Sequence, residues 1–462
     1  MLYSRYNQKA IVGNRYSDGL GPVIITAMSV LSKLRSSISP QNSLLLFYHQ
    51  LVAIAAAIWY RFPGSRLKVI AITGTKGKST ATHLLASILQ AAGYKVGVAS
   101  TIHFQIGETI WANETKQTTQ GRFELQRLLR EMVKAKCDFA ILEVTSHAMV
   151  QSRLWGVNVD TAVLTNIQRD HLEYHGGFEN YLHAKGLLFA LLGRAERKMG
   201  IQKTAILPSD DPNVNYFETF PSDRKITFGA KGMVRAADSV AFADGTRFTI
   251  KVPNDEINLY LKIPGEFNVQ NALAAAAAAV AHGIKLSAVK KGLEVDMEIP
   301  GRIEVIRAGQ PFTVVVDYAH TPTSLEKLLS LFKPLTKGKL YAVFGATGGG
   351  RDKGKRAEMG KIAGRYADYV VLTDDDPYTE NRMQIIEQVA EGVGRKEGGN
   401  FWKIRDRKQA IRLALTLAKE GDTVVIAGKG CEPIQIIGEE KIPWDDRKIA
   451  REILSAAVKV TL

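Results

Sequence analysis

The chain has 462 residues, enough for about two or three domains, because a single hydrophobic core stops growing well before this length. Its apolar content of 45% and charged content of 23% are those of a globular protein and exclude extensive disorder. Lysine and arginine outnumber aspartate and glutamate by 61 to 46, so we expect anionic partners. These basic residues are spread along the chain without interleaved aromatics, which favours phosphorylated small molecules and argues against a nucleic-acid partner.

Two cysteines occur, Cys137 and Cys431, and they form no CxxC pair. This excludes a disulfide framework and a cysteine-based zinc site, and it favours a reducing, cytoplasmic location. The first 20 residues are polar and lack the continuous apolar core of a signal peptide.

An apolar segment, "SLLLFYHQLVAIAAAIWY", covers residues 43–60 and follows Lys33 and Arg35. Its 18 residues barely suffice to span a bilayer, and His49 and Gln50 near its middle would each need a partner there. Three interpretations stay open: a helix packed on the protein, a helix in peripheral contact with a membrane, and a membrane span. We expect the packed helix first.

From residue 67 onward the pattern is that of an α/β fold. Short apolar, β-rich runs alternate with amphipathic helical stretches, which indicates a parallel sheet covered on both faces. Residues 225–263 alternate like short strands and predict a small β-rich insertion. After Pro300 strand-then-loop units begin again, typical of a second, doubly wound Rossmann-like domain. The predicted parts are a short helical N-terminal region (1–66), a central domain (67–299) and a C-terminal domain (300–462).

The stretch "VIAITGTKGKSTATHLLASIL" joins a predicted strand to a predicted helix through a glycine-rich loop. A standard phosphate loop, GxxxxGK[ST], would need glycine where this chain has Ile72. The loop is shorter, but its glycines still let backbone N–H groups approach phosphate oxygens at a helix N-terminus, while a lysine supplies a cation and a hydroxyl can bind Mg²⁺. The residues predicted to bind ATP here are Gly74, Thr75, Lys76, Gly77, Lys78, Ser79 and Thr80.

The compact form T-G-T-x-G-K-[ST]-[ST] resembles the ATP loop of the Mur ligase superfamily, which includes muramyl peptide ligases, folylpolyglutamate synthetase and part of cyanophycin synthetase. The segments "EVTSHAMVQSR" and "TNIQRDHLEYHGG" are similar to the MurE-type tripeptide ligases, and the similarity covers nearly all of residues 67–462. The resemblance implies an ATP- and Mg²⁺-dependent amide ligase of peptidoglycan precursor synthesis. A folylpolyglutamate- or cyanophycin-type ligase, a lipid-linked muramyl peptide ligase and a non-catalytic scaffold are the alternatives.

In the resembled ligases these segments supply Mg²⁺ ligands, and the lysine of an "AK" pair that follows them is carbamylated. Glu143 and His171 inherit the metal-ligand role beside the Ser79 hydroxyl. Lys185 occupies the position of the carbamylated lysine; CO₂ adds to an unprotonated amine, and the product is an anion able to bind a second Mg²⁺. The expected catalytic residues are Lys78, Glu143, His171 and Lys185.

Other segments resemble the family in the same order along the chain. "PGEFNVQNALAA", "PGRIE" and "VVVDYAHTP" resemble its nucleotide-side segments, which makes Asn268, Asn271, Arg302, Asp317 and His320 candidates for binding ATP. "QTTQGRFELQRLL" resembles the segment that holds the muramyl peptide, with glutamine in place of the family proline. The muramyl-peptide candidates are Thr118, Thr119, Thr145, Gln151 and Arg153.

The C-terminal domain binds the incoming amino acid in the resembled ligases. Arg351 in "GGGRDKGKR", and Gly428 with Glu432 in "GKGCE", match the positions concerned. A carboxylate suits an ammonium on the side chain of the amino acid, and an arginine suits its α-carboxylate.

One departure from the family bears on which amino acid is added. Enzymes that add meso-diaminopimelate carry D-N-P-R at a loop where this chain has Asp375, Asp376, Pro377 and Tyr378. The arginine that would bind the second carboxylate is absent, and Asp376 would repel that carboxylate. We therefore expect a diamino acid with one carboxylate, such as lysine.

A MurE-type enzyme normally has a separate uridine-binding N-terminal domain of about a hundred residues. About 66 residues precede the phosphate-loop domain in this sequence, a layout that resembles folylpolyglutamate synthetase. Two forms of the muramyl substrate are therefore expected beside the free amino acid: a UDP-linked peptide, or a lipid-linked peptide presented at a membrane.

Overall fold

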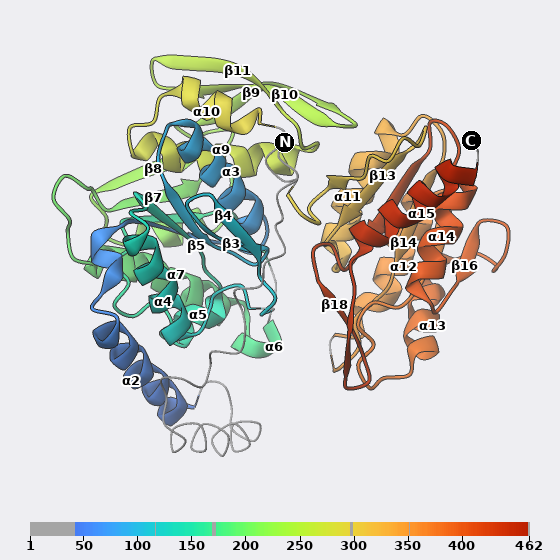
Figure 1. Ribbon diagram of the computed structural model, residues 1–462, viewed down its shortest axis with the longest axis horizontal. Helices are drawn as coiled ribbons and strands as arrows, with labels where there is room; N and C mark the ends of the chain where they lie inside the picture. The colour runs from blue at the N-terminus through green and yellow to red at the C-terminus, as the bar shows by residue number, and fades with distance from the viewer. Residues whose placement is uncertain (1–41, 116, 169–171, 296–298, 351, 461–462) are drawn as a thin grey trace. The chain divides into compact units, whose positions relative to one another are not determined.

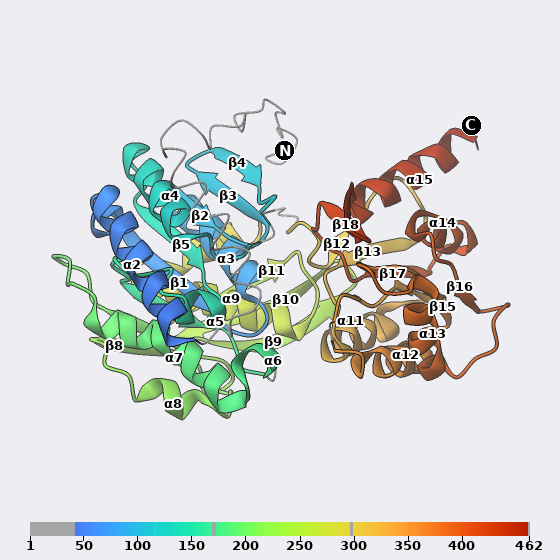
Figure 2. The same ribbon diagram turned by 90° about the horizontal axis from the view of Figure 1, so that it is seen from below.

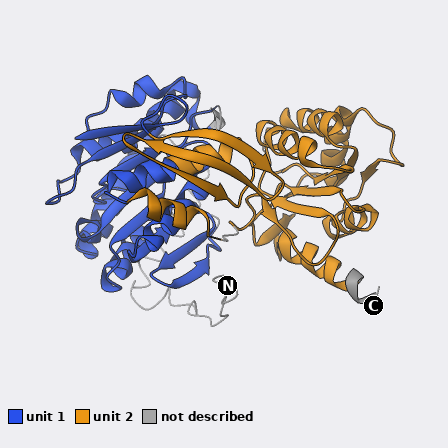
Figure 3. Ribbon diagram, turned by 90° about the horizontal axis from the view of Figure 1, so that it is seen from above, with its two compact units in different colours: residues 1–233, 274–284 blue, residues 234–273, 285–462 orange. Residues whose placement is uncertain are grey.

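The computed structural model describes residues 42–115, 117–168, 172–295, 299–350 and 352–460. It divides into two compact units, residues 1–233 with 274–284 and residues 234–273 with 285–462, which Figure 3 distinguishes by colour. Each unit is α/β and is described by itself. The predicted domain boundaries near residues 67 and 300 stay predictions.

The first unit contains an eight-stranded sheet in the order β4-β3-β2-β5-β1-β6-β7-β8. Strands β2, β5, β1, β6, β7 and β8 are parallel, and β3 and β4 add an antiparallel edge. The predicted parallel-rich sheet is thus confirmed. The strands are β1 (Lys68–Thr73), β2 (Val96–Ala99), β3 (His103–Ile106), β4 (Thr109–Ala112), β5 (Phe139–Glu143), β6 (Thr161–Leu164), β7 (Thr204–Pro208) and β8 (Arg224–Phe228).

Helices flank this sheet (Figures 1 and 2). Alternate residues of a strand face opposite sides, so Val69 and Ala71 of β1 join the core that also contains Leu128, Leu129 and Phe189. That core lies against α4, α5 and α7. The helices are α2 (Ser43–Trp59), α3 (Lys78–Ala91), α4 (Arg122–Lys134), α5 (Ser146–Val150), α6 (Leu172–His175), α7 (Phe178–Arg194) and α8 (Val214–Glu218), with a 3₁₀ turn η1 (Pro63–Arg66) and the alanine-rich α9 (Glu266–Ala281), whose first half is assigned to the second unit.

Helix α2 is the apolar segment of the sequence. Asn42 caps it, because the side chain of Asn42 accepts a hydrogen bond from the backbone N–H of Leu44 at 2.9 Å. The helix buries His49 and three alanines and packs against α4, as expected for a helix packed on the protein. Within the described ranges, we find no helix with the length and apolarity needed to cross a bilayer.

His282, just after α9, makes the stability of the first unit depend on pH. Its ring lies edge-on to Phe139, and its Nε2 is 2.9 Å from the Thr161 hydroxyl. Burial, with the nearby Lys68 ammonium, lowers the pKa of His282 to about 4. In the unfolded chain the His282 imidazole is protonated below about pH 6.5. In the folded protein it is protonated only below about pH 4.

We therefore expect the free energy of unfolding to fall by up to about 3 kcal/mol as the pH drops through this window. In His282→Gln that part of the loss should disappear, whereas His183→Gln, at an exposed histidine, should leave it unchanged. Urea unfolding at pH 7 and pH 5 measures this. Equal pH dependence in all three proteins would contradict the assignment.

The second unit begins with a three-stranded antiparallel sheet in the order β11-β10-β9, against which α10 (Leu286–Leu293) packs. It confirms the predicted β-rich insertion, with one correction. Residues 224–228 form β8 and belong to the main sheet of the first unit, because they pair in parallel with β7. The insertion consists of β9 (Arg235–Phe242), β10 (Gly245–Val252) and β11 (Asp255–Leu261).

The main sheet of the second unit has the order β12-β13-β17-β14-β15-β16, parallel except for the edge strand β12. Strands β13, β14, β15 and β17 are the strands of the strand-then-loop units predicted after Pro300; the sequence missed the short β16 and the β18–β19 hairpin. The elements are β12 (Glu304–Val305), β13 (Thr313–Asp317), α11 (Pro322–Leu335), β14 (Leu340–Phe344), α12 (Lys355–Tyr366), β15 (Tyr369–Leu372), α13 (Arg382–Val393), β16 (Phe401–Lys403), α14 (Arg407–Leu417), β17 (Thr423–Ala427), β18 (Ile434–Ile437), β19 (Glu440–Pro443) and α15 (Asp446–Val460).

Candidate functional site

The glycine-rich loop lies between the end of β1 and the start of α3. Gly74 has φ of 146°, and a Cβ added there would lie 1.9 Å from the Thr165 hydroxyl oxygen, so only glycine fits. The segment after β6 fixes the loop, because Asn166 accepts hydrogen bonds from the backbone N–H of Thr75 at 2.9 Å and of Lys76 at 3.0 Å. The loop is thus held in one shape at the N-terminus of a helix, where phosphate groups bind.

Two lysines converge on this loop. Lys78 donates to the carbonyl oxygens of Gly74 at 3.0 Å and Thr75 at 3.1 Å. Lys185, from α7, donates to the same Gly74 carbonyl at 2.8 Å. The predicted catalytic lysines, 107 residues apart in the sequence (185 − 78), therefore share one acceptor. Two cations beside a glycine loop suit a polyphosphate.

Glu143 lies at the end of β5, buried beside the start of α3. Its carboxylate accepts from the Ser79 hydroxyl at 3.0 Å. The Thr101 hydroxyl and backbone N–H donate to it at 2.9 and 2.8 Å. Sequence reasoning missed Thr101; the only signal for it is its place after β2, the neighbour of β5 in the sheet.

This oxygen-rich arrangement fits Mg²⁺, which takes one or two carboxylates and fills its other positions with water and phosphate oxygens. Among the described residues there is no group of three or more histidine, cysteine or acidic side chains that could hold a metal by itself. Ser79 and Glu143 would therefore be the protein's contribution there. His171, the other predicted ligand, lies outside the described residues.

Lys185 is buried, with only 2% of its surface exposed. Its ammonium lies 4.8 Å from the centre of the Tyr181 ring, and the Tyr181 hydroxyl is 2.9 Å from the Thr75 hydroxyl. Helix α7 is in this way tied to the phosphate loop at two points. Carbamylation of Lys185 stays a prediction.

The muramyl-peptide candidates adjoin Glu143. The Thr119 hydroxyl donates to the Glu143 backbone carbonyl at 3.0 Å and accepts from the Thr145 N–H at 3.0 Å. The Thr101 hydroxyl donates a hydrogen bond to the Thr118 hydroxyl at 2.9 Å. Arg153 donates to the Thr119 carbonyl and, at 3.0 Å, to the Gln151 side chain. The structure thus brings all five candidates into one hydrogen-bonded group with the phosphate-loop cluster: Thr118, Thr119, Thr145, Gln151 and Arg153.

The nucleotide-side candidates of the second unit form two separate groups. Asn268 and Asn271 lie at the start of α9, where the Asn271 amide donates to Asn268 Oδ1 at 3.2 Å. The Arg302 guanidinium lies 4.7 Å from the centre of the Tyr318 ring. Among the described residues, no hydrogen bond joins the asparagine pair to the arginine.

Asp317 and His320 have local roles in the turn after β13. Asp317 accepts from the backbone N–H of Ile303 and of Ala319, each at 2.8 Å. His320 Nδ1 lies 2.7 Å from the Tyr318 carbonyl oxygen. The Asp317 carboxylate therefore orders the turn at the end of β13.

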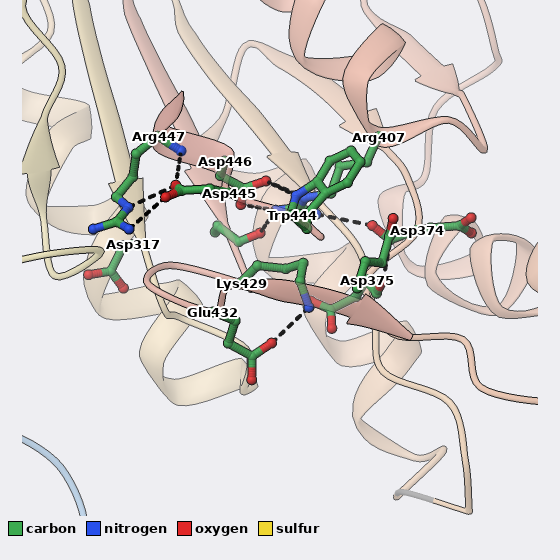
Figure 4. A network of polar contacts seen from close by, with 12 residues as sticks. Asp317, Asp374, Asp375, Arg407, Lys429, Glu432, Trp444, Asp445, Asp446 and Arg447 are labelled. Atoms are coloured by element: carbon green, nitrogen blue, oxygen red, sulfur yellow. Dashed lines mark hydrogen bonds and ion pairs between the residues drawn. The ribbon is translucent and has the colours of Figure 1, made fainter. Parts of the chain in front are cut away.

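An acidic cluster follows β15 in the second unit, and β17 ends beside it (Figure 4). Asp375 accepts from the Thr347 hydroxyl at 3.1 Å through one oxygen, while its other oxygen, buried, has no hydrogen-bond partner among the described residues. A Cβ on Gly428 would lie 2.5 Å from that second oxygen, so glycine is needed here. Burial would raise the pKa of Asp375, but Lys429 and Arg407 outweigh it and the pKa is lowered.

Lys429 links the loop after β15 to the loop after β17, and it was not predicted from the sequence. Its ammonium bonds to Asp376 at 2.8 Å and to Glu432 at 2.7 Å. Burial would lower the pKa of Lys429, but the carboxylates of Asp375, Glu432 and Asp376 raise it instead. The lysine is therefore firmly charged.

This pair corrects one sequence-based interpretation. Asp376 was expected to repel a second substrate carboxylate, but Lys429 compensates its charge and the Ile436 N–H bonds to it at 2.8 Å. The repulsion is therefore weaker than the bare sequence indicates. Tyr378 follows with φ of 52°, and its carbonyl oxygen accepts from the Gly438 N–H at 2.8 Å.

Arg407 was also missed, because it lies away from every motif. It is fully buried at the start of α14 and makes a two-fold ion pair with Asp446, at 2.8 and 2.7 Å (Figure 4). It also donates to the carbonyl oxygens of Asp374 at 3.1 Å and Ala427 at 2.9 Å. One guanidinium thus fixes the ends of β15 and β17, from which both loops start. Arg351 lies outside the described residues.

The comparisons with known proteins agree with this geometry. Residues 72–279 match the Mur ligase middle domain, and residues 301–430 match the Mur ligase glutamate ligase domain. A UDP-N-acetylmuramyl-tripeptide synthetase of Roseiflexus sp. strain RS-1 is 42% identical over 418 residues, which cover 87% of this chain and 82% of that protein. This chain belongs to the Mur ligase family.

Other relatives place it more closely within the family. The UDP-N-acetylmuramoyl-L-alanyl-D-glutamate–2,6-diaminopimelate ligase of Geobacillus kaustophilus is 42% identical, over 88% of this chain and 82% of that protein. A solved structure of a ligase with the same name has 33% identity and a TM-score of 0.61, covering 85% of this chain and 79% of that one. The chain is an ATP-dependent amide ligase of the MurE type in peptidoglycan precursor synthesis.

Escherichia coli FolC in complex with ADP shares the fold alone, with 22% identity and a TM-score of 0.63 over 94% of this chain and 97% of that one. The predicted layout resemblance to folylpolyglutamate synthetase is therefore a resemblance of fold. The MurE-type prediction made from the motifs is confirmed by the relatives named above.

Proposed function

We propose that this ligase joins a diamino acid with a single carboxylate, such as lysine, to UDP-N-acetylmuramoyl-L-alanyl-D-glutamate. The observation that carries the proposal is the cluster in which Lys78 and Lys185 share the Gly74 carbonyl. Ser79 and Glu143 lie beside them and are linked to the muramyl-peptide candidates through Thr119. Phosphate-binding and peptide-binding groups of one reaction need such proximity.

In the proposed reaction the substrate carboxylate attacks the γ-phosphate of ATP, and the amine of the amino acid then displaces phosphate from the acyl phosphate. Lys78 and the loop N–H groups bind the phosphates and hold the charge that spreads over their oxygens. Bound Mg²⁺ would supply further positive charge at these oxygens, held by Ser79 and Glu143. Thr119 and Arg153 orient the peptide.

The UDP-linked substrate is proposed because two relatives of 42% identity carry UDP-linked muramyl peptides in their names. The names of these relatives favour neither the lipid-linked alternative nor a folate substrate. Supplying each muramyl or folate substrate with ATP, and measuring ADP release that depends on an amino acid, separates them.

The choice of amino acid rests on the loop after β15. Tyr378 stands where the meso-diaminopimelate enzymes have arginine, so the bidentate partner for a second carboxylate is missing. Two carboxylates, Asp375 and Glu432, lie near the loop ends and suit an ammonium group. Lys429 neutralises part of this charge, which leaves the substitution at Tyr378 as the main argument.

We expect Tyr378→Arg to shift preference toward meso-diaminopimelate. The ratio of kcat/KM for meso-diaminopimelate over lysine should rise about ten-fold or more, because one charged hydrogen-bonded pair is gained. Tyr378→Phe is the matched control and should leave the ratio unchanged. Steady-state kinetics with both amino acids measures this. An unchanged ratio in Tyr378→Arg would remove the specificity argument.

A further inference from the structure

Helix α2 carries a stripe of large apolar side chains that face solvent. The exposed fractions run from 39% for Tyr48 to 79% for Leu44. Seven of the thirteen exposed large hydrophobic residues in the described part of the chain lie between residues 44 and 62. The members of the stripe on α2 are Leu44, Phe47, Tyr48, Leu51, Ile58 and Trp59.

These positions share one helical face, because residues that are three, four or seven positions apart lie on the same side of an α-helix. The opposite face buries His49 and the small residues Ala53, Ala56 and Ala57 against the protein. The large apolar groups thus point outward and the small ones inward. A helix whose only role was to pack on the core would bury its large apolar side chains. The exposed face of α2 therefore indicates an interaction surface.

The charge around the helix indicates the kind of partner. Between Asp18 and Glu108 the sequence contains no acidic residue and eight lysines and arginines. Two of these, Arg61 and Arg66, are exposed just after the helix. Helix α4, packed against α2, adds Arg127 and Lys134 but also Glu124 and Glu131, whose charges act on Tyr60. Because the charges of the α2 segment itself are all basic, its apolar stripe is complementary to a surface that is apolar inside and anionic at its edge.

We propose that the α2 stripe binds the surface of an anionic phospholipid bilayer, with the helix lying in the interface. The helix has 17 residues, about 26 Å at 1.5 Å per residue, and lies along the interface without crossing it. Trp59 and Tyr48 suit the headgroup level, because each combines an apolar ring with a polar atom. This contact is independent of the proposed substrate.

Sedimentation of the full-length protein with vesicles tests the proposal. The vesicles contain either phosphatidylcholine alone or phosphatidylcholine with phosphatidylglycerol. We expect binding to the anionic vesicles, weakened several-fold by raising the salt concentration. A triple variant, Phe47→Ser with Leu51→Ser and Ile58→Ser, should bind at least about ten-fold more weakly.

The control variant removes three exposed apolar groups elsewhere: Met199→Ser with Val240→Ser and Phe242→Ser. It should bind vesicles like the wild type, and both variants should keep the ATP-dependent activity measured without vesicles. Absence of binding to anionic vesicles, or equal binding by the two triple variants, would overturn the proposal. So would self-association without lipid that the Phe47 triple variant abolishes, because the stripe would then bind a second copy.

Discussion

Lys78→Ala should lower kcat for ATP-dependent ligation by at least about 100-fold, because an electrostatic contact to the phosphate groups is lost in the transition state. The lysine lies at the first position of α3, and its ammonium is already directed at the loop through Gly74 and Thr75. The change removes no buried apolar group, so the fold should persist. Release of ADP that depends on both the muramyl substrate and the amino acid measures the effect.

Lys134→Ala is a suitable control for Lys78→Ala. Lys134 is a lysine in a helix of the same unit, but it is exposed, and among the described residues it pairs with Glu131 of its own helix. It should leave kcat unchanged. Full activity in Lys78→Ala would remove the assignment of the glycine loop as the ATP site.

Arg407→Ala should lower the free energy of unfolding of the second unit by about 3 to 5 kcal/mol. The change leaves the Asp446 carboxylate buried without its two-fold partner, and it removes the donors to the ends of β15 and β17. Burial would lower the pKa of Arg407, but Asp446 raises it, so the guanidinium is charged in the folded protein. Chemical denaturation followed by circular dichroism measures the loss.

Arg412→Ala is the matched control for Arg407→Ala, since it removes the same side chain from an exposed position of the same helix. It should change stability by less than about 0.5 kcal/mol. The double variant Arg407→Met with Asp446→Leu should recover much of the loss, because no uncompensated charge remains. If Arg407→Ala and Arg412→Ala behaved alike, the buried pair would not hold the two loops.

The sequence predicted those features that are local or repeat along the chain. The apolar runs at residues 67–72, 139–142, 161–164 and 204–207 predicted β1, β5, β6 and β7 to within about a residue, because strands buried on both faces are continuously apolar. The glycine loop was also predicted, because its backbone conformation requires glycine at two positions. The Mur ligase family followed from these motifs.

Ion pairs between residues far apart in the chain could not be predicted from the sequence. Lys429 and Asp376 lie 53 residues apart and Arg407 and Asp446 lie 39 apart, so no spacing rule connects them. Asp376 read alone is a repelling charge; only the fold supplies its partner. The short strand β16 was missed because three residues carry too little periodicity to predict it.

The measurement that tests the account most directly is a mass spectrum of the reaction product. Purified protein is incubated with ATP, Mg²⁺ and UDP-N-acetylmuramoyl-L-alanyl-D-glutamate, with lysine, meso-diaminopimelate and glutamate offered in separate reactions. The account predicts that lysine gives the nucleotide-linked tripeptide, with one ADP released for each amide formed, and that meso-diaminopimelate reacts more slowly. A product obtained only with meso-diaminopimelate or glutamate, or no ADP release that depends on an amino acid, would contradict it.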